Sequence, residues 1–165
     1  VVNWAIPQLE GKMDLPKELL DNYKNDFGKA YQAIPRQVIH RDPNPGNIIL
    51  SEKEWGFIDF ELSERNVRIF DPCYAAPAIL SESFAEGDVH KWIKWVDIYK
   101  NIIYGYDAVV TLTDEEKWAV PYVVLSNQLL ATAWFFDKEK FKELYEVNKK
   151  MTEWIAGHFE ELKIE

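Results

Sequence analysis

The 165-residue sequence predicts a mainly helical α+β fold, built as a single lobe with one short β-hairpin. Beyond residue 70, apolar residues recur at helical spacing behind capping residues, which predicts amphipathic helices. Residues 47–50 and 55–60 are short β-prone runs separated by a polar segment, which is typical of a hairpin. A chain of this length buries about two thirds of its unfolded surface, enough for one core.

The first half of the chain predicts a helix, a strand and a turn in that order. Residues 16–33 open with a proline, carry apolar residues at helical spacing and stop before Pro35, so we expect an amphipathic helix. Residues 37–39 are β-prone and end at His40. The prolines and glycine within residues 43–46 then exclude helix, which places Asp42 on a loop.

The second half predicts four helices. Asp71 reads as the N-cap of a helix that reaches about residue 84, and Asp88 as the start of the next. Residues 113–116 form a capping box for a helix that we expect to bend at Pro121, and Asp137 caps the last helix. The side chains expected to face inward are those of Val89, Trp92, Val96, Tyr99, Ile103, Trp118, Tyr122, Leu125, Leu129, Phe136, Phe141, Leu144, Met151, Ile155 and Leu162.

One short stretch has the spacing of phosphoryl-transfer chemistry. Residues 40–47 read His-Arg-Asp-Pro-Asn-Pro-Gly-Asn, and Asp59 follows twelve residues after Asn47. In the kinase pattern the first Asp accepts the proton of the attacking hydroxyl, while the Asn and the later Asp hold magnesium through oxygen atoms. These positions are Asp42, Asn47 and Asp59, and the predicted hairpin would make the two metal ligands neighbours.

An ordinary surface turn is the competing interpretation, because Asp, Asn and Pro cluster in turns. The turn alone does not account for a fixed spacing flanked by β-prone runs and followed by a second run that ends in Asp59. We therefore favour a catalytic and metal-binding role for these residues over an ordinary surface turn.

At these residues the chain resembles the aminoglycoside phosphotransferase and choline kinase superfamily, whose members phosphorylate small molecules with a protein-kinase-like fold. Residues 59–61 read Asp-Phe-Glu where protein kinases have Asp-Phe-Gly, and residues 71–75 are similar to the Asp-Pro-x-x-Asp helix start of that superfamily. Residues 76–78 lack the Ala-Pro-Glu of protein kinases. Two departures are Arg41, where the superfamily usually has Gly, and Ala75 at the second Asp of its helix motif.

The resemblance implies ATP as co-substrate, Mg²⁺ as cofactor and a C-terminal lobe spanning residues 1–165. No Gly-rich phosphate loop or phosphate-pairing Lys precedes His40, so the nucleotide-gripping N-terminal lobe is expected to be absent from this chain. A cut fragment and a one-lobed relative are both compatible with this pattern. The resemblance also implies that His40 and Arg41 support the loop. Glu61 could contact a magnesium ion through water, attract an ammonium group, or lie on the surface.

Composition excludes several classes of function. A net charge of -9 argues against nucleic-acid binding, which needs a basic surface. No apolar run is long enough to span a membrane, and no signal peptide is visible. The single Cys73 cannot form an internal disulfide, so we expect a buried thiol and a cytoplasmic location.

Acidic charge gathers in the predicted helical half. Residues 71–165 hold 17 acidic and 10 basic side chains. They either attract a cationic, amine-bearing hydroxyl acceptor, such as an aminoglycoside, a choline-like or a homoserine-like compound, or form solvated helix faces. The expected function is thus a small-molecule kinase, with a non-catalytic kinase-like binding module and a protein kinase as alternatives. The choice between ATP and GTP stays open.

Overall fold

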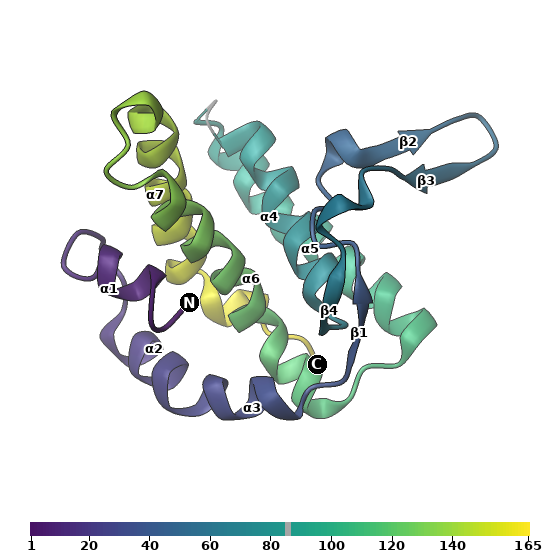
Figure 1. The fold of residues 1–165 in the computed structure, drawn as a ribbon, viewed down its shortest axis with the longest axis horizontal. Coiled ribbons are helices and arrows are strands. Elements are labelled where there is room, and N and C mark those ends of the chain that lie inside the picture. The colour runs from purple at the N-terminus through teal and green to yellow at the C-terminus, as the bar shows by residue number, and fades with distance from the viewer. Residues whose placement is uncertain (85–86) are drawn as a thin grey trace.

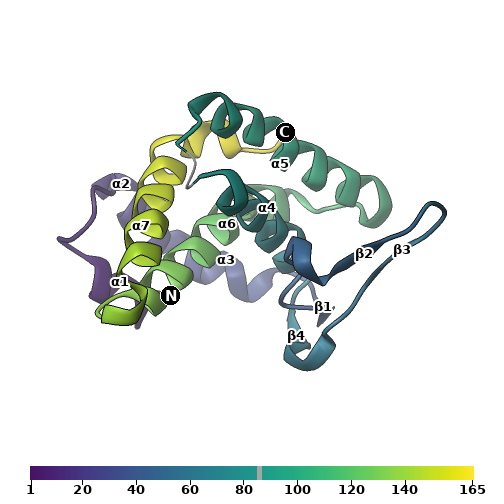
Figure 2. The same ribbon diagram turned by 90° about the horizontal axis from the view of Figure 1, so that it is seen from above.

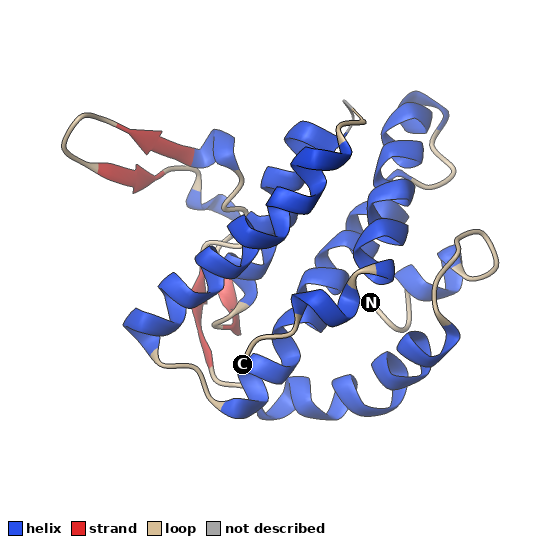
Figure 3. Ribbon diagram, turned by 180° about the vertical axis from the view of Figure 1, so that it is seen from behind, coloured by secondary structure: helices blue, strands red, loops and turns tan. Residues whose placement is uncertain are grey.

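The computed structural model describes residues 1–84 and 87–165 and shows a mainly helical α+β fold (Figure 3). This confirms the predicted fold class. The helices are α1 (Ala5–Leu9), α2 (Lys17–Asn22), α3 (Gly28–Ala33), α4 (Phe70–Phe84), α5 (Val89–Val110), α6 (Asp114–Phe135) and α7 (Lys142–Gly157). The strands are β1 (Arg36–Ile39), β2 (Ile48–Leu50), β3 (Trp55–Phe57) and β4 (Glu64–Val67). Shorter turns are the π-helical η1 (Tyr23–Phe27) and the 3₁₀ turns η2 (Pro45–Asn47), η3 (Phe60–Leu62), η4 (Glu139–Phe141) and η5 (Phe159–Leu162).

The core forms around α6, which contacts α1, α4 and α7 (Figure 1). Its middle, from Ala119 to Leu129, is buried along its whole length. Trp95 and Tyr99 of α5 complete the core, and their polar atoms are satisfied. The Trp95 indole donates to the carbonyl of Ala76 at 2.6 Å, and the Tyr99 hydroxyl to the carbonyl of Leu162 at 2.5 Å. Fully buried polar tips of this kind need such partners.

The helix predicted over residues 16–33 is interrupted. A π-helical turn, η1, separates α2 from α3. The turn spans Tyr23 and Phe27, whose buried rings lie 5.0 Å apart and both face Tyr122 of α6. The Tyr23 hydroxyl also shares a short hydrogen bond with the hydroxyl of Ser126. Packing of both rings on α6 accounts for a deviation that the helical pattern alone does not predict.

The predicted hairpin is confirmed, with a shorter second strand. β2 and β3 pair antiparallel, with Ile48 opposite Phe57, and project from the helical body (Figures 1 and 2). The second strand ends at Phe57 because Asp59 takes a left-handed conformation with a φ of 65°. The strand predicted near residue 37 is β1, which pairs with β4, a strand that was not predicted.

Two helix starts differ from the prediction. Asp71 is not an N-cap, because α4 already begins at Phe70 and the Asp71 carboxylate accepts bonds from the loop ahead of β2 instead. The last predicted helix is divided into η4, α7 and η5. Asp137 does not cap it: this residue has a φ of 56°, which turns the chain away from helical geometry.

The other two helix starts are confirmed. Asp88 accepts bonds from two backbone N–H groups at the start of α5, and Thr113 forms the capping box of α6 with Glu116. The predicted bend at Pro121 does not end the helix, since α6 runs through that residue. Three side chains expected to face inward are exposed instead: Val89, Trp118 and Leu144.

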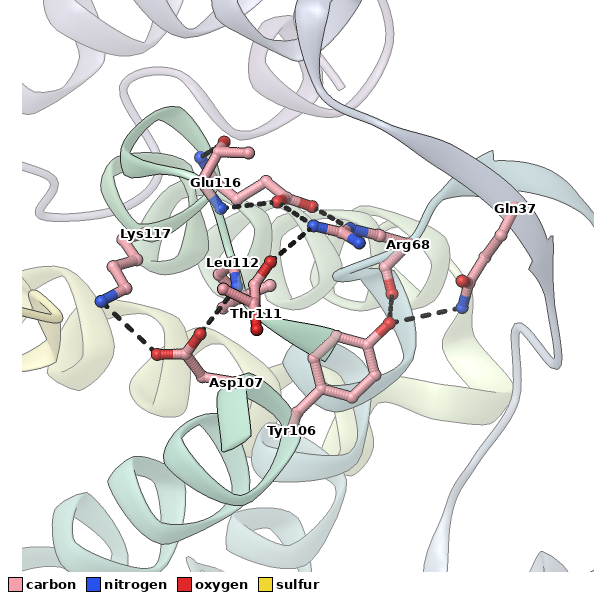
Figure 4. Close-up of polar contacts among 9 residues, drawn as sticks. Gln37, Arg68, Tyr106, Asp107, Thr111, Leu112, Glu116 and Lys117 are labelled. Atoms are coloured by element: carbon pink, nitrogen blue, oxygen red, sulfur yellow. Dashed lines mark hydrogen bonds and ion pairs between the residues drawn. The ribbon is translucent and has the colours of Figure 1, made fainter. Parts of the chain in front are cut away.

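A buried ion pair ties β4 to the junction between α5 and α6 (Figure 4). The side chain of Glu116 is fully buried, and its two carboxylate oxygens each accept a 2.6 Å hydrogen bond from Arg68. Arg68 also donates to the carbonyl of Thr111 at 3.0 Å, and its own carbonyl accepts the Tyr106 hydroxyl at 2.9 Å. Hydrogen bonding to Glu116 raises the pKa of the Arg68 guanidinium.

Candidate active site

Asp42 lies on the loop between β1 and η2, as the prolines of that loop predicted. Its carboxylate accepts a 2.9 Å hydrogen bond from the side-chain amide of Asn44 and a 3.2 Å bond from that of Asn47. The same Asn47 amide nitrogen also donates to the Asp42 carbonyl at 2.9 Å. The carboxylate is therefore held in place by neighbours five or fewer residues away.

Tyr74 reaches the same carboxylate from α4. Its hydroxyl is hydrogen-bonded to Asp42, and burial, followed by this bond and the carboxylate charge, raises the pKa of Tyr74 above its usual range. The hydroxyl consequently stays protonated and acts as a donor at neutral pH. Sequence reasoning missed Tyr74 because a contact across 32 residues leaves no local pattern, although Tyr74 stands in the motif that suggested the helix start.

His40 joins the loop to the residue before Asp59. Its buried ring approaches the carbonyl of Ile58 at 2.7 Å through Nε2 and the backbone N–H of Asp42 at 3.3 Å through Nδ1. With Nε2 protonated, the ring donates to Ile58 and accepts from Asp42. The contact with the backbone ahead of Asp59 is the one expected for a supporting histidine.

Asp71 holds the backbone of the loop from the opposite side. Its carboxylate oxygens accept from the N–H groups of His40 at 2.8 Å and Arg41 at 2.9 Å. Arg41 has a φ of 75°, a strained value for a residue with a side chain. Its side chain forms a 3.2 Å ion pair with Glu64 of β4. The start of α4 and the edge of β4 together fix the turn that presents Asp42.

Asn47 and Asp59 lie at the open base of the hairpin. The backbone N–H of Ile58 donates to the carbonyl of Asn47 at 3.0 Å, which extends the hairpin pairing and places Asp59 next in line. The side-chain nitrogen of Asn47 donates to Asp42. The side-chain oxygen of Asn47 is therefore the atom left for a cation. The side chain of Asp59 is exposed and makes no hydrogen bond or ion pair within residues 1–84 and 87–165.

Glu61 lies in η3, two residues after Asp59, and is exposed. Over the described part of the chain, no group of three or more His, Cys, Asp and Glu side chains could hold a metal ion. The chemistry of the donor set nevertheless suits magnesium, which takes one or two protein oxygens and completes its shell with water and phosphate. Asn47 and Asp59 supply that number of oxygen ligands.

A cavity of about 320 Å³ opens beside Asp42 and is called here the α4–α6–α7 cavity. Asn44 and Tyr74, both bonded to the Asp42 carboxylate, line one end of it. Its walls come from α4, α6 and α7. Glu82 of α4 is the acidic side chain in its lining. The volume lies at the lower end of the range for small-molecule sites.

A second cavity, of about 450 Å³, lies between the N-terminal residues, β4 and α6. Arg41 and Glu64 line it, but their side chains are paired with each other. Of these two cavities, the α4–α6–α7 cavity is the one whose lining includes residues bonded to the Asp42 carboxylate, Asn44 and Tyr74. Both cavities share one lining residue, Asn127 of α6.

Comparison with known protein families decides the assignment. The model described as the Phosphotransferase enzyme family matches residues 2–99, which is more than half of the chain. The chain belongs to this phosphotransferase family. The match confirms the resemblance carried by the residues around Asp42, and with it the kinase-like lobe as the fold class. No curated protein and no solved structure matches the chain.

The family match takes in the loop, the hairpin and α4, but leaves α6 and α7 outside it. Phosphotransferase chemistry is thus assigned at the level of the family, while two of the three helices that line the cavity, α6 and α7, lie outside the matched residues. In the described residues of this phosphotransferase, no helix is both long enough and apolar enough to cross a membrane.

Proposed function

We propose that this phosphotransferase transfers the γ-phosphoryl group of ATP to a hydroxyl of a small, amine-bearing molecule. One observation carries the proposal. The amide nitrogen of Asn47 is bonded to Asp42 while its oxygen is left for a cation, beside the position of Asp59. A base and two oxygen ligands therefore adjoin one another, as phosphoryl transfer requires.

In the proposed reaction, Asp42 orients the acceptor hydroxyl and takes its proton. The hydroxyl oxygen forms a bond to the γ-phosphorus as the bond to the β–γ bridging oxygen breaks, and ADP leaves with that electron pair. Tyr74, Asn44 and Asn47 hold the Asp42 carboxylate in one orientation throughout. Such positioning supplies much of the rate enhancement when the transition state is loose.

Asn47 and Asp59 would hold magnesium, with Glu61 within reach through water. When bound, the ion neutralises charge on the phosphate oxygens. His40 and Asp71 fix the backbone on which these ligands stand. No further metal-binding side chain is needed, because the phosphates fill the remaining positions.

The hairpin offers a nonpolar surface for the nucleotide base. Ile49, Leu50 and Trp55 are exposed on the hairpin that carries the proposed metal ligands at its base, and Leu50 retains 76% of its accessible surface. Exposed apolar side chains gathered on one short element mark a binding surface. We expect the base, and a nucleotide-gripping lobe of the kind this superfamily has, to cover them. The assignment of residues 1–165 to a single acceptor-binding lobe remains a prediction.

The acceptor would occupy the α4–α6–α7 cavity, with its reactive hydroxyl toward Asp42. Glu82 lines this cavity, and its carboxylate makes no hydrogen bond or ion pair in the described part of the chain, so it is available to an ammonium group. The net negative charge of residues 71–165 adds long-range attraction for a cation. Glu82 is the acidic residue of the cavity lining, so the local attraction for an ammonium group depends on Glu82.

A substrate panel tests the proposal. The full-length protein is incubated with MgATP and either kanamycin, choline, homoserine, glucosamine or glucose, and phosphate esters are identified by mass spectrometry. We expect acceptor-dependent ester formation with at least one amine, abolished by chelation of magnesium. Binding of ATP or an acceptor without any turnover would instead indicate a non-catalytic binding module. Preference for glucose over every amine would refute the proposal that the acceptor bears an amine, but not the proposal that the protein is a kinase.

A further inference from the structure

Among the described residues, two buried side-chain nitrogens have no hydrogen-bond partner: the indole nitrogen of Trp92 and the amide nitrogen of Asn127. We consider Asn127, because it lines a cavity. It lies in the middle of α6, and only 7% of its surface is exposed. Its side-chain amide nitrogen is fully enclosed and has no hydrogen-bond partner among the described residues. A buried amide without a partner costs free energy, so its retention calls for a reason.

The polar residues on either side of Asn127 are both satisfied. Ser126 bonds to the Tyr23 hydroxyl and to the carbonyl of Tyr122. The Gln128 amide donates to the backbone carbonyl and the side-chain oxygen of Asn148, at 3.2 Å and 3.0 Å. Polar side chains at this depth of α6 therefore serve defined contacts, and Asn127 is the one whose contact is missing.

Asn127 lies at the wall shared by the two cavities next to the loop that carries Asp42. It approaches the α4–α6–α7 cavity from α6, while the carboxylate of Asp42 is bonded to Tyr74 on α4 and to Asn44 on the loop. A molecule that fills the cavity would lie against Asn127 on one side and, on the other, against Asn44 and Tyr74, the two lining residues bonded to the Asp42 carboxylate. An amide nitrogen donates two hydrogen bonds, so the group of the molecule that meets Asn127 must be a hydrogen-bond acceptor.

We infer that Asn127 is a specificity-determining residue, which binds a second oxygen of the acceptor, apart from the hydroxyl that is phosphorylated. The inference rests on the proposed function and narrows its acceptor to a polyhydroxylated amine of about monosaccharide size. A mono-hydroxyl quaternary amine such as choline brings no second oxygen and would leave the Asn127 amide buried and unpaired. A site built to hydrogen-bond a substrate rejects analogues that lack the matching group.

The contact is observable without catalysis. The Asn127 side-chain amide pair is followed by ¹H–¹⁵N NMR of the chain and assigned through its loss in Asn127→Leu. Glucosamine and glucose are expected to shift this pair saturably, and choline is expected to leave it in place. An equal shift with choline, or no shift with either sugar, overturns the inference.

A pair of variants separates recognition from a structural role. Asn127→Leu removes an unsatisfied buried amide, so its unfolding temperature should equal or exceed that of the wild type, while its affinity for glucosamine falls by about tenfold. Gln128→Leu breaks the bonds to Asn148 and should lower the unfolding temperature. Asn101→Leu, at an exposed amide of α5, is the affinity control. If Asn127→Leu destabilises the chain as much as Gln128→Leu and binds glucosamine normally, Asn127 is structural.

Failure of this inference and failure of the proposed function can be distinguished. A sugar that shifts Asn127 but is never phosphorylated with MgATP would refute the proposed reaction and leave the binding inference standing. Phosphorylation of amines that make no contact at Asn127 would support the proposed reaction and refute the role of Asn127.

Discussion

At the scale of single residues, the proposed base and metal ligands depend on a few short contacts. Asp42 is held by the amides of Asn44 and Asn47 and by the hydroxyl of Tyr74. Asp59 has none of this support, and its left-handed backbone turns it out of the strand. Aspartate and asparagine tolerate this conformation better than most residues, which decides how Asp59 should be tested.

The metal assignment predicts a loss of magnesium-dependent nucleotide binding in Asp59→Asn. This change keeps the backbone conformation and the size of the side chain but removes its negative charge. Titration calorimetry with ATP, with and without magnesium, should show that the ion no longer increases affinity. Glu52→Gln, on the exposed hairpin turn, serves as the control. An unchanged magnesium effect in Asp59→Asn would show that the negative charge of Asp59 does not contribute to the magnesium site.

Tyr74 is expected to act as a positioning residue for Asp42. Tyr74→Phe removes one hydrogen bond to a carboxylate and keeps a ring stacked on Phe70, with centroids 6.1 Å apart. We expect kcat to fall by about tenfold while KM for ATP stays the same, because only the orientation of Asp42 changes. Steady-state kinetics of the full-length protein checks this. A rise in KM for ATP at unchanged kcat would contradict the assignment.

At the scale of elements, the features that depend only on neighbouring residues were predicted correctly. The caps at Asp88 and Thr113 and the polar turn of the hairpin are short-range features, and all three are present. β4 was missed because residues 64–67 are mostly polar, and the strand forms only by pairing with β1. The π turn was missed for a related reason, since it depends on packing against α6.

The candidate site also has residues that the sequence predicts and contacts that only the folded structure reveals. Asp42, Asn47 and Asp59 could be predicted from their spacing along the chain. Their surroundings could not, because Asp71 and Tyr74 reach the loop from about 30 residues away. Asn127 carries no motif at all. Its significance comes from the missing partner, which only a folded structure reveals.

The ion pair between Arg68 and Glu116 should be the most sensitive polar contact between elements (Figure 4). Glu116→Gln leaves the Arg68 guanidinium without its counter-charge, and removal of one partner of such a buried pair typically costs about 3–5 kcal/mol. Urea denaturation should show this loss of unfolding free energy. Glu115→Gln, at the exposed neighbouring position, should change stability little. Equal stability of the two variants would show that the pair contributes nothing.

At the scale of the whole molecule, the aromatic core predicts alkaline unfolding. Burial raises the pKa values of Tyr23, Tyr74 and Tyr99 above the ordinary value of 10.0. The folded chain therefore holds these protons more tightly than the unfolded chain does. This stabilisation is fully present below pH 10 and is lost as pH rises through the raised folded-state pKa values.

We accordingly expect the thermal unfolding temperature to fall steadily above pH 10. Tyrosinate absorbance should show these three residues ionising together with unfolding. Normal titration of all tyrosines near pH 10 in a chain that stays folded would contradict the buried positions of Tyr23 and Tyr99.

In the proposed reaction, this chain is the part of the phosphotransferase that carries the base, Asp42. The most direct test is the turnover of Asp42→Asn in the full-length protein, with MgATP and the best acceptor of the panel. This variant keeps the size of the side chain and should fold normally. We predict that kcat falls by roughly two to four orders of magnitude, with ATP affinity nearly unchanged, because the variant loses proton acceptance but no metal ligand. A normal kcat for Asp42→Asn would contradict the central claim.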